Sequence, residues 1–224
     1  MDRRDDAIEP FDAAYKALVD VAAAMDEDTS WCPTACDGWA ARDLLFHCLG
    51  DAQRALVALH SPTDLPADRD AVTYWKDWKP DPTAAANGRR FVRVAASMFL
   101  HYEPLRDLSR DTLEAVRDAA KQVPQAQRLR TQGHVLTCGD LLRTLSVEAS
   151  LHHLDMLAGL PHLPQASMLG LTETRKTVEL LLGRVLPATW DDVHCARVCT
   201  GRAALSQEER RLLGEVAERL PVIA

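Results

Sequence analysis

Two side chains of metal-binding type, Glu148 and His152, lie four positions apart in a segment with a helical pattern, residues 139–160. At about 100° per residue, both fall, together with Asp155, inside a broad apolar arc. Side chains at i and i+4 share one face of a helix and reach each other. Because desolvating a carboxylate is costly, Glu148 needs a partner. A divalent metal shared with His152 would serve; a Glu–His hydrogen bond or an arginine pair in the core is the alternative.

A third ligand would have to come from a facing helix. His47 lies beside the apolar stripe of an earlier helical segment, where a histidine bonded to a backbone carbonyl is the alternative. Three ligands of the N, O and N type leave an open coordination position, as in catalytic zinc sites. His134, in a turn before residue 139, would approach the mouth of such a site, although a plain loop position is the simpler interpretation. The polar arc of the 139–160 segment is expected to be exposed; it carries Arg143, Ser146, Ser150 and His153.

Long amphipathic segments joined by loops must position these residues, and they predict an all-α protein. The expected form is a helical bundle over residues 1–160, with a short, mainly helical extension, 161–224, packed on it. Asp37 is the expected N-cap of the second helix, and residues 124–133 are expected to form a polar loop. The helices are predicted at 11–25, 39–60, 82–122 with a break at Pro104, 139–158, 172–186 and from Ser206 onward, and the only strand at 192–199.

Composition excludes several classes of function. The chain has 224 residues and a net charge of −7, so it lacks the basic character of a nucleic-acid-binding protein. No apolar stretch approaches the roughly 20 residues of a membrane span, and the charged first residues do not resemble a secretory signal. A cytoplasmic location is therefore expected, with the six cysteines as reduced thiols rather than metal ligands or disulfides.

Two motifs carry a resemblance to a known family. Residues 38–47 read GWAARDLLFH, which resembles the GWxxRDLLxH signature of the DinB-like superfamily, and in particular its mycothiol-dependent maleylpyruvate isomerase N-terminal branch. Residues 133–137, GHVLT, and 147–155, VEASLHHLD, are similar to the second half of that pattern. The resemblance implies an up-and-down four-helix bundle over residues 1–160 that holds a divalent metal, usually zinc, with nickel or iron as other choices. Carried over residue by residue, the ligands are His47, Glu148 and His152.

The resemblance also has limits. Ala40 stands where the family often has a capping Ser or Thr. The isomerase carries a sizeable second domain that supplies an essential arginine, whereas only 64 residues follow Leu160 here. None of the arginines in this tail can be assigned from the sequence; they include Arg175, Arg184, Arg197 and Arg202.

The chemistry that the resemblance implies is activation of a small thiol, in the family mycothiol. Metal coordination deprotonates a thiol at neutral pH and makes it a nucleophile for S-transfer to, or isomerisation of, a small electrophilic substrate. Asp155 would orient a ligand ring, or would simply be solvated or paired with an arginine. A metal-hydroxide hydrolase, a non-catalytic metal- or thiol-binding protein and an iron oxygenase remain alternatives. The expected partners are a small-molecule substrate and a thiol, and the chain is expected to be a monomer or homodimer.

Overall fold

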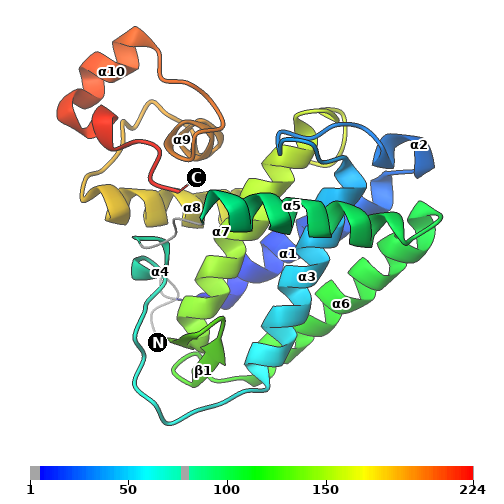
Figure 1. Cartoon of the computed structure of the whole chain (residues 1–224). Helices are drawn as coiled ribbons and strands as arrows, with labels where there is room; N and C mark the ends of the chain where they lie inside the picture. Colours follow the sequence, from blue (N-terminus) through cyan, green and yellow to red (C-terminus); the bar gives the residue numbers. More distant parts are fainter. Residues whose placement is uncertain (1–5, 77–80, 224) are drawn as a thin grey trace.

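The computed structural model describes residues 6–76 and 81–223, and it is mostly helical (Figure 1). The all-α prediction is confirmed. The helices are α1 (Ile8–Ala24), α2 (Glu27–Ser30), α3 (Ala41–Leu59), α4 (Thr73–Lys76), α5 (Pro82–Ser97), α6 (Tyr102–Gln122), α7 (Cys138–Leu157), α8 (Met168–Leu182), α9 (Asp192–Cys199) and α10 (Gln207–Leu213), followed by a 3-10 turn at Gly214–Arg219. Among the described residues, no helix is long and apolar enough to cross a membrane.

Helices α1, α3, α6 and α7 form the bundle. Helix α1 packs against α6 and α7, and α3 packs against the same two helices, so the four enclose one apolar core. In Figure 1, α1 and α7 run in one direction and α3 and α6 in the other. Consecutive helices α1 and α3, and likewise α6 and α7, are therefore antiparallel. Helices α3 and α6 are parallel, so the bundle is all-α as predicted but does not have the strictly alternating up-and-down order. The chain that follows α3 must therefore return, through α4 and α5, to the end of the bundle at which α3 began.

A β-hairpin and a helix replace two predicted elements. Strands β1 (Arg128–Thr131) and β2 (His134–Thr137) pair antiparallel, with Thr131 opposite His134. The polar loop predicted at residues 124–133 is therefore wrong for β1 and the hairpin turn. The turn between them places Gln132 and Gly133 at positive φ, as a two-residue hairpin turn requires. The strand predicted at 192–199 is wrong, because this segment forms α9. At the start of α9, the Asp191 side chain accepts a hydrogen bond from His194 N. Most of the apolar residues of α9 are buried.

Three predicted helix boundaries also differ from the structure; the helix predicted at 172–186 is α8, which runs from Met168 to Leu182. Helix α3 begins after Ala40, not after Asp37; the Asp43 carboxylate accepts a hydrogen bond from Ala40 N at 3.0 Å and replaces the missing side-chain cap. Pro104 does not interrupt a helix, since it lies in the first turn of α6, where proline fits. The break lies before Tyr102, whose backbone N donates to Glu27 Oε2 at 2.6 Å.

The arc of α7 that was expected to be exposed is buried. Helix α8 lies across α7 and α1 and covers it. His153 is 1 % exposed, and its Nε2 is 2.8 Å from Pro164 O. Arg143 Nη1 donates to Glu173 Oε1 of α8 at 2.7 Å. The apolar residues on this side of α7 join a second core cluster with α8, α9 and the chain end; they include Val147, Leu151 and Leu154.

Gly170 allows the close approach of α8 to α7. A Cβ at this position would lie 2.2 Å from Ser150 Oγ and 3.1 Å from Ala14 Cβ. We expect Gly170→Ala to lower the free energy of unfolding by about 1–3 kcal/mol, because the helices must separate or the serine must rotate. Urea unfolding measures this change, and Ser150→Ala in the same chain should recover part of it.

Gly88, in the middle of α5, is the matched control. A Cβ there would meet no heavy atom within 4 Å. Gly88→Ala should therefore stabilise the protein by about 0.5–1 kcal/mol through helix propensity alone. Equal effects of the two substitutions would contradict the close approach of α8 and α7.

Candidate metal centre

The three residues predicted to be ligands lie together where α3 packs against α7. His47 belongs to α3, whereas Glu148 and His152 lie one turn apart on α7. The Nε2 atoms of His47 and His152 are 3.1 Å apart, and the two rings meet edge to face with centroids 4.7 Å apart. Glu148 Oε2 lies 3.4 Å from His152 Nε2. The bundle thus brings together side chains that are about 100 residues apart in the sequence.

A fourth side chain, Asp51, joins them, and the sequence analysis missed it. It follows His47 by one turn of α3, and its Oδ2 lies 3.4 Å from His47 Nε2. Its Oδ1 is paired with Arg54 Nη2. The spacing of His47 and Asp51 on α3 is the reverse of that of Glu148 and His152 on α7. This mirrored spacing was the available signal for Asp51.

Burial and neighbouring charges shift the pKa values of this group. Burial, and then the proximity of His152, lowers the pKa of His47 to about 3. Burial also raises the pKa of Asp51, and the charge of Glu148 raises it further. The pKa of His152 is raised well above its ordinary value: burial opposes the shift, but the hydrogen bond with Asp155 and further contacts with Cys36 and Glu148 outweigh it. The two carboxylates and the two imidazole rings thus lie close together in a partly buried site, and each shifts the pKa of its neighbours.

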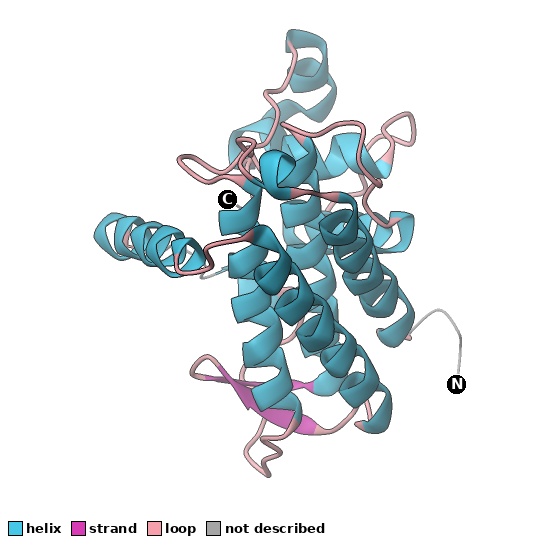
Figure 2. Ribbon diagram, turned by 90° about the vertical axis from the view of Figure 1, so that its right-hand side faces the viewer, coloured by secondary structure: helices cyan, strands magenta, loops and turns pink. Residues whose placement is uncertain are grey.

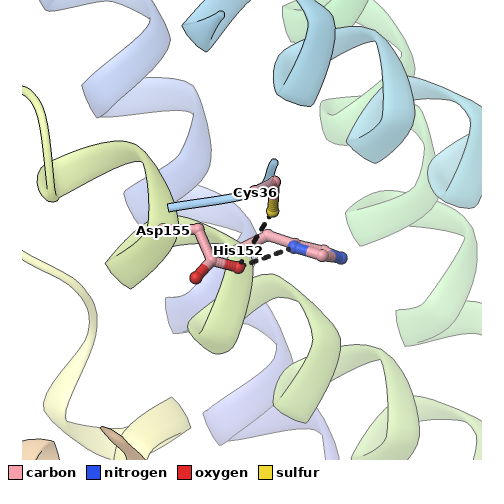
Figure 3. A group of neighbouring side chains, drawn as sticks. All are labelled: Cys36, His152 and Asp155. Carbon is pink, nitrogen blue, oxygen red and sulfur yellow. Dashed lines mark hydrogen bonds and ion pairs between the residues drawn. The ribbon is translucent and has the colours of Figure 1, made fainter. Parts of the chain in front are cut away.

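Asp155 holds the other side of the His152 ring (Figure 3). Its Oδ2 lies 3.2 Å from His152 Nδ1 and 3.5 Å from Cys36 Sγ. Arg202, from the turn after α9, donates to both carboxylate oxygens at 2.8 Å. Although burial opposes the shift, the hydrogen bonds from His152 and Arg202 lower the pKa of Asp155 to about 2. The arginine pairing that the sequence analysis offered for Asp155 is confirmed, and the same carboxylate contacts the His152 ring. Arg202 could not be assigned from the sequence, because it reaches this position only in the tertiary structure.

The donor spacing of His47, Asp51 and His152 suits a divalent metal, since their ligand atoms all lie within 4.8 Å of one another, whereas Glu148 joins this group through His152. Four ligands at the 2.0–2.1 Å typical of zinc lie about 3.3 Å from one another in a tetrahedron. The measured separations are 3.1 Å between the histidine Nε2 atoms and 3.4 Å from each histidine to its carboxylate. Imidazole and carboxylate donors suit zinc, iron, nickel and manganese. A second group, Cys36, His152 and Asp155, is also compact, but Arg202 already occupies both oxygens of Asp155.

A cavity of about 720 Å³ opens onto these four side chains. Trp39, Tyr74 and Trp75 contribute to its walls, and the chain end reaches it at Ile223. Helix α5 forms another wall; Figure 2 shows it at the left, standing away from the bundle. The cavity-lining residues of α5 are Ala85, Gly88, Arg89, Phe91 and Val92. The arrangement therefore offers room for a ligand beside the donors.

The other histidines singled out in the sequence lie elsewhere. His134 is in β2, with its Nδ1 2.8 Å from Asp68 Oδ2, and it is not among the residues that line the cavity. His153 is buried, and its Nε2 contacts Pro164 O in the segment between α7 and α8. Neither is brought to the candidate metal centre.

Comparison with known proteins agrees with the motifs. Residues 11–157 match the family described as mycothiol maleylpyruvate isomerase N-terminal domain. A crystal structure of the mycothiol-dependent maleylpyruvate isomerase superposes with a TM-score of 0.54 at 15 % identity, over 79 % of this chain and 68 % of that one, which shows a common fold. No curated protein sequence matches the chain significantly.

The family match spans both halves of the bundle, and it includes the segments of α3 and α7 that carry the four converging side chains. The chain therefore belongs to the mycothiol maleylpyruvate isomerase N-terminal domain family.

Proposed function

We propose that His47, Glu148 and His152 bind one divalent metal, most suitably zinc, and that the protein is an enzyme that uses this metal to activate a small thiol. The convergence of two imidazole Nε2 atoms and partly buried carboxylates on the wall of a cavity carries the proposal. Membership of a family named for a mycothiol-dependent isomerase supports mycothiol, or another small thiol, as cosubstrate. The reaction is S-transfer to, or isomerisation of, a small electrophilic molecule.

A bound metal would supply a position at which a thiol, with an ordinary pKa near 8.5, loses its proton at neutral pH. The residues of the chain prepare that position. Asp155 accepts a hydrogen bond from the Nδ1–H group of His152. With the proton on Nδ1, the Nε2 atom can present its lone pair to the cavity. Arg202 fixes Asp155 through two hydrogen bonds. The ring of Trp39 lies 5.3 Å from that of His47 and limits its rotation.

Helix α5 leaves space for the thiol and its electrophile. Ala85, Gly88 and Val92 recur at a helical spacing on the wall of the cavity. Neither the backbone nor packing requires glycine at residue 88, because its φ is not positive and a Cβ there would meet nothing. Since glycine weakens a helix interior, its presence on this wall is explained by the room it gives a ligand.

Removing a histidine ligand should empty the centre. We expect His47→Ala and His152→Ala each to reduce bound zinc to below about a tenth of one per chain after dialysis, because two remaining ligands rarely hold the ion. Metal analysis of the purified protein measures this. His60→Ala is the control, since this exposed residue ends the same helix, α3, and its Nδ1 contacts only Leu56 O. Equal metal in the His47 and His60 variants would refute the assignment.

Metal affinity should increase with pH. The raised pKa of His152 means that the metal-free protein holds a proton there at neutral pH, and the metal must displace it. The metal-free form is therefore favoured as pH falls, and affinity should change by up to about tenfold per pH unit for each proton released. Calorimetry in buffers of different ionisation enthalpy should show release of at least one proton. Binding without proton release would contradict this protonation state.

Filling the cavity from α5 should block the thiol without removing the metal. We expect Gly88→Leu to weaken mycothiol binding at least tenfold while leaving metal content near that of the wild type. Gly88→Ala, which adds a single methyl group, is the matched control. Thiol affinity is measured by titration of the metal-loaded protein. Retained metal with no affinity for mycothiol or another small thiol in the wild type would favour a hydrolytic or non-catalytic protein.

A further inference from the structure

We propose that Asp51 is a fourth protein ligand of the metal, which would make the donor set two imidazoles and two carboxylates. This inference rests on the proposed function, because it concerns the same metal. The ligand atoms of His47, Asp51 and His152 all lie within 4.8 Å of one another. Glu148 contacts this group through His152, 3.4 Å away. Asp51 is thus at least as well placed as the carboxylate predicted from the sequence.

The directions of α3 and α7 place both carboxylates on the same side of the histidine pair. Asp51 lies one turn after His47, whereas Glu148 lies one turn before His152. Because the two helices are antiparallel in Figure 1, both steps lead toward the same end of the bundle. The four side chains therefore form two levels, with the histidine Nε2 atoms at one and the carboxylates at the other. A cation held by His47, Asp51 and His152, whose ligand atoms lie within 4.8 Å of one another, would have the Glu148 carboxylate beside it through His152.

The contacts of Asp51 leave one of its oxygens available. Arg54 pairs with Oδ1, whereas Oδ2 faces His47 Nε2 at 3.4 Å. An arginine on the outer oxygen holds a ligating carboxylate in place, as hydrogen bonds commonly do around metal sites. The side chain is 16 % exposed, so Asp51 is not a solvated surface residue. Two carboxylates facing a common centre repel each other, and a divalent cation between them offsets that repulsion.

A fourth protein ligand changes which metals the centre accepts. With three protein ligands, a zinc ion would have one position left, and a thiol at that position would complete a tetrahedral arrangement. With four, a bound thiol raises the coordination number to at least five, which suits iron, nickel, cobalt or manganese as well as zinc. Cobalt(II) reports the difference directly, because its visible absorption is strong in a tetrahedral site and weak at higher coordination numbers.

The test uses the full chain loaded with Co²⁺ alone and, separately, with Zn²⁺ alone, in the wild type and in Asp51→Asn. We expect Asp51→Asn to lower the affinity for both ions at least tenfold and to change the intensity of the cobalt spectrum. Gln53→Ala is the matched control, since this exposed residue of α3 lies outside the donor group; its cobalt spectrum should match that of the wild type. If Asp51→Asn does not fold, as judged by circular dichroism, Asp51→Ser replaces it.

The outcomes separate this inference from the proposed function. Loss of metal from His47→Ala, together with an unchanged affinity and cobalt spectrum in Asp51→Asn, would overturn the role of Asp51 alone. A lower affinity with an unchanged spectrum would also overturn it, because Asp51 would then act only by orienting His47. Metal retained in His47→Ala, or no metal bound by the wild type, would overturn the proposed function itself.

Discussion

Two imidazole Nε2 atoms lie 3.1 Å apart where α3 packs against α7, with a carboxylate one turn away on each helix. Such a group is costly to bury, because carboxylates lose hydration and repel each other. The surrounding structure holds it in place. The apolar stripes of α1, α3, α6 and α7 fix the helix positions, and the antiparallel course of α3 and α7 puts both carboxylates on one side of the histidines. The polar group and the apolar core are thus set by the same helix contacts.

The segment after α7 takes part in both the core and the site. Helix α8 covers the polar arc of α7, so that Ser150 is buried at a close helix contact that Gly170 permits, and the segment before α8 contacts the buried His153 through Pro164. Farther along, Arg202 reaches back to Asp155 and through it to His152. The family match ends at residue 157, yet the hydrogen-bond chain that orients His152 continues beyond it. The extension therefore contributes to the geometry of the centre as well as to stability.

The cavity results from the long connection between α3 and α6. Because α3 and α6 are parallel, α4 and α5 must cross back along the bundle, and α5 packs against α3 on one side only. Small residues at Ala85 and Gly88 leave space between α5 and the histidine pair. The connection between α3 and α6 thus forms a wall of the cavity in which a ligand would contact a bound metal.

The sequence by itself determined the helical class and most of the candidate ligands. The periodicity of α7 put Glu148 and His152 on one face, and the motif around residues 38–47 supplied His47. The mirrored spacing on α3 contained the signal for Asp51, but only the antiparallel packing of α3 and α7 shows that it faces the other three side chains.

Other features depended on the tertiary structure. The burial of His153 and the contact of Arg202 could not be predicted, since one involves the segment that leads into α8 and the other a contact across 47 residues. The short elements at residues 128–137 and 192–199 were misjudged for the same reason: a few residues carry too little periodicity, and their turn geometry, caps and burial decide the result. The periodicity of the sequence shows which face of a helix is apolar, whereas only the tertiary packing determines which residues contact that face.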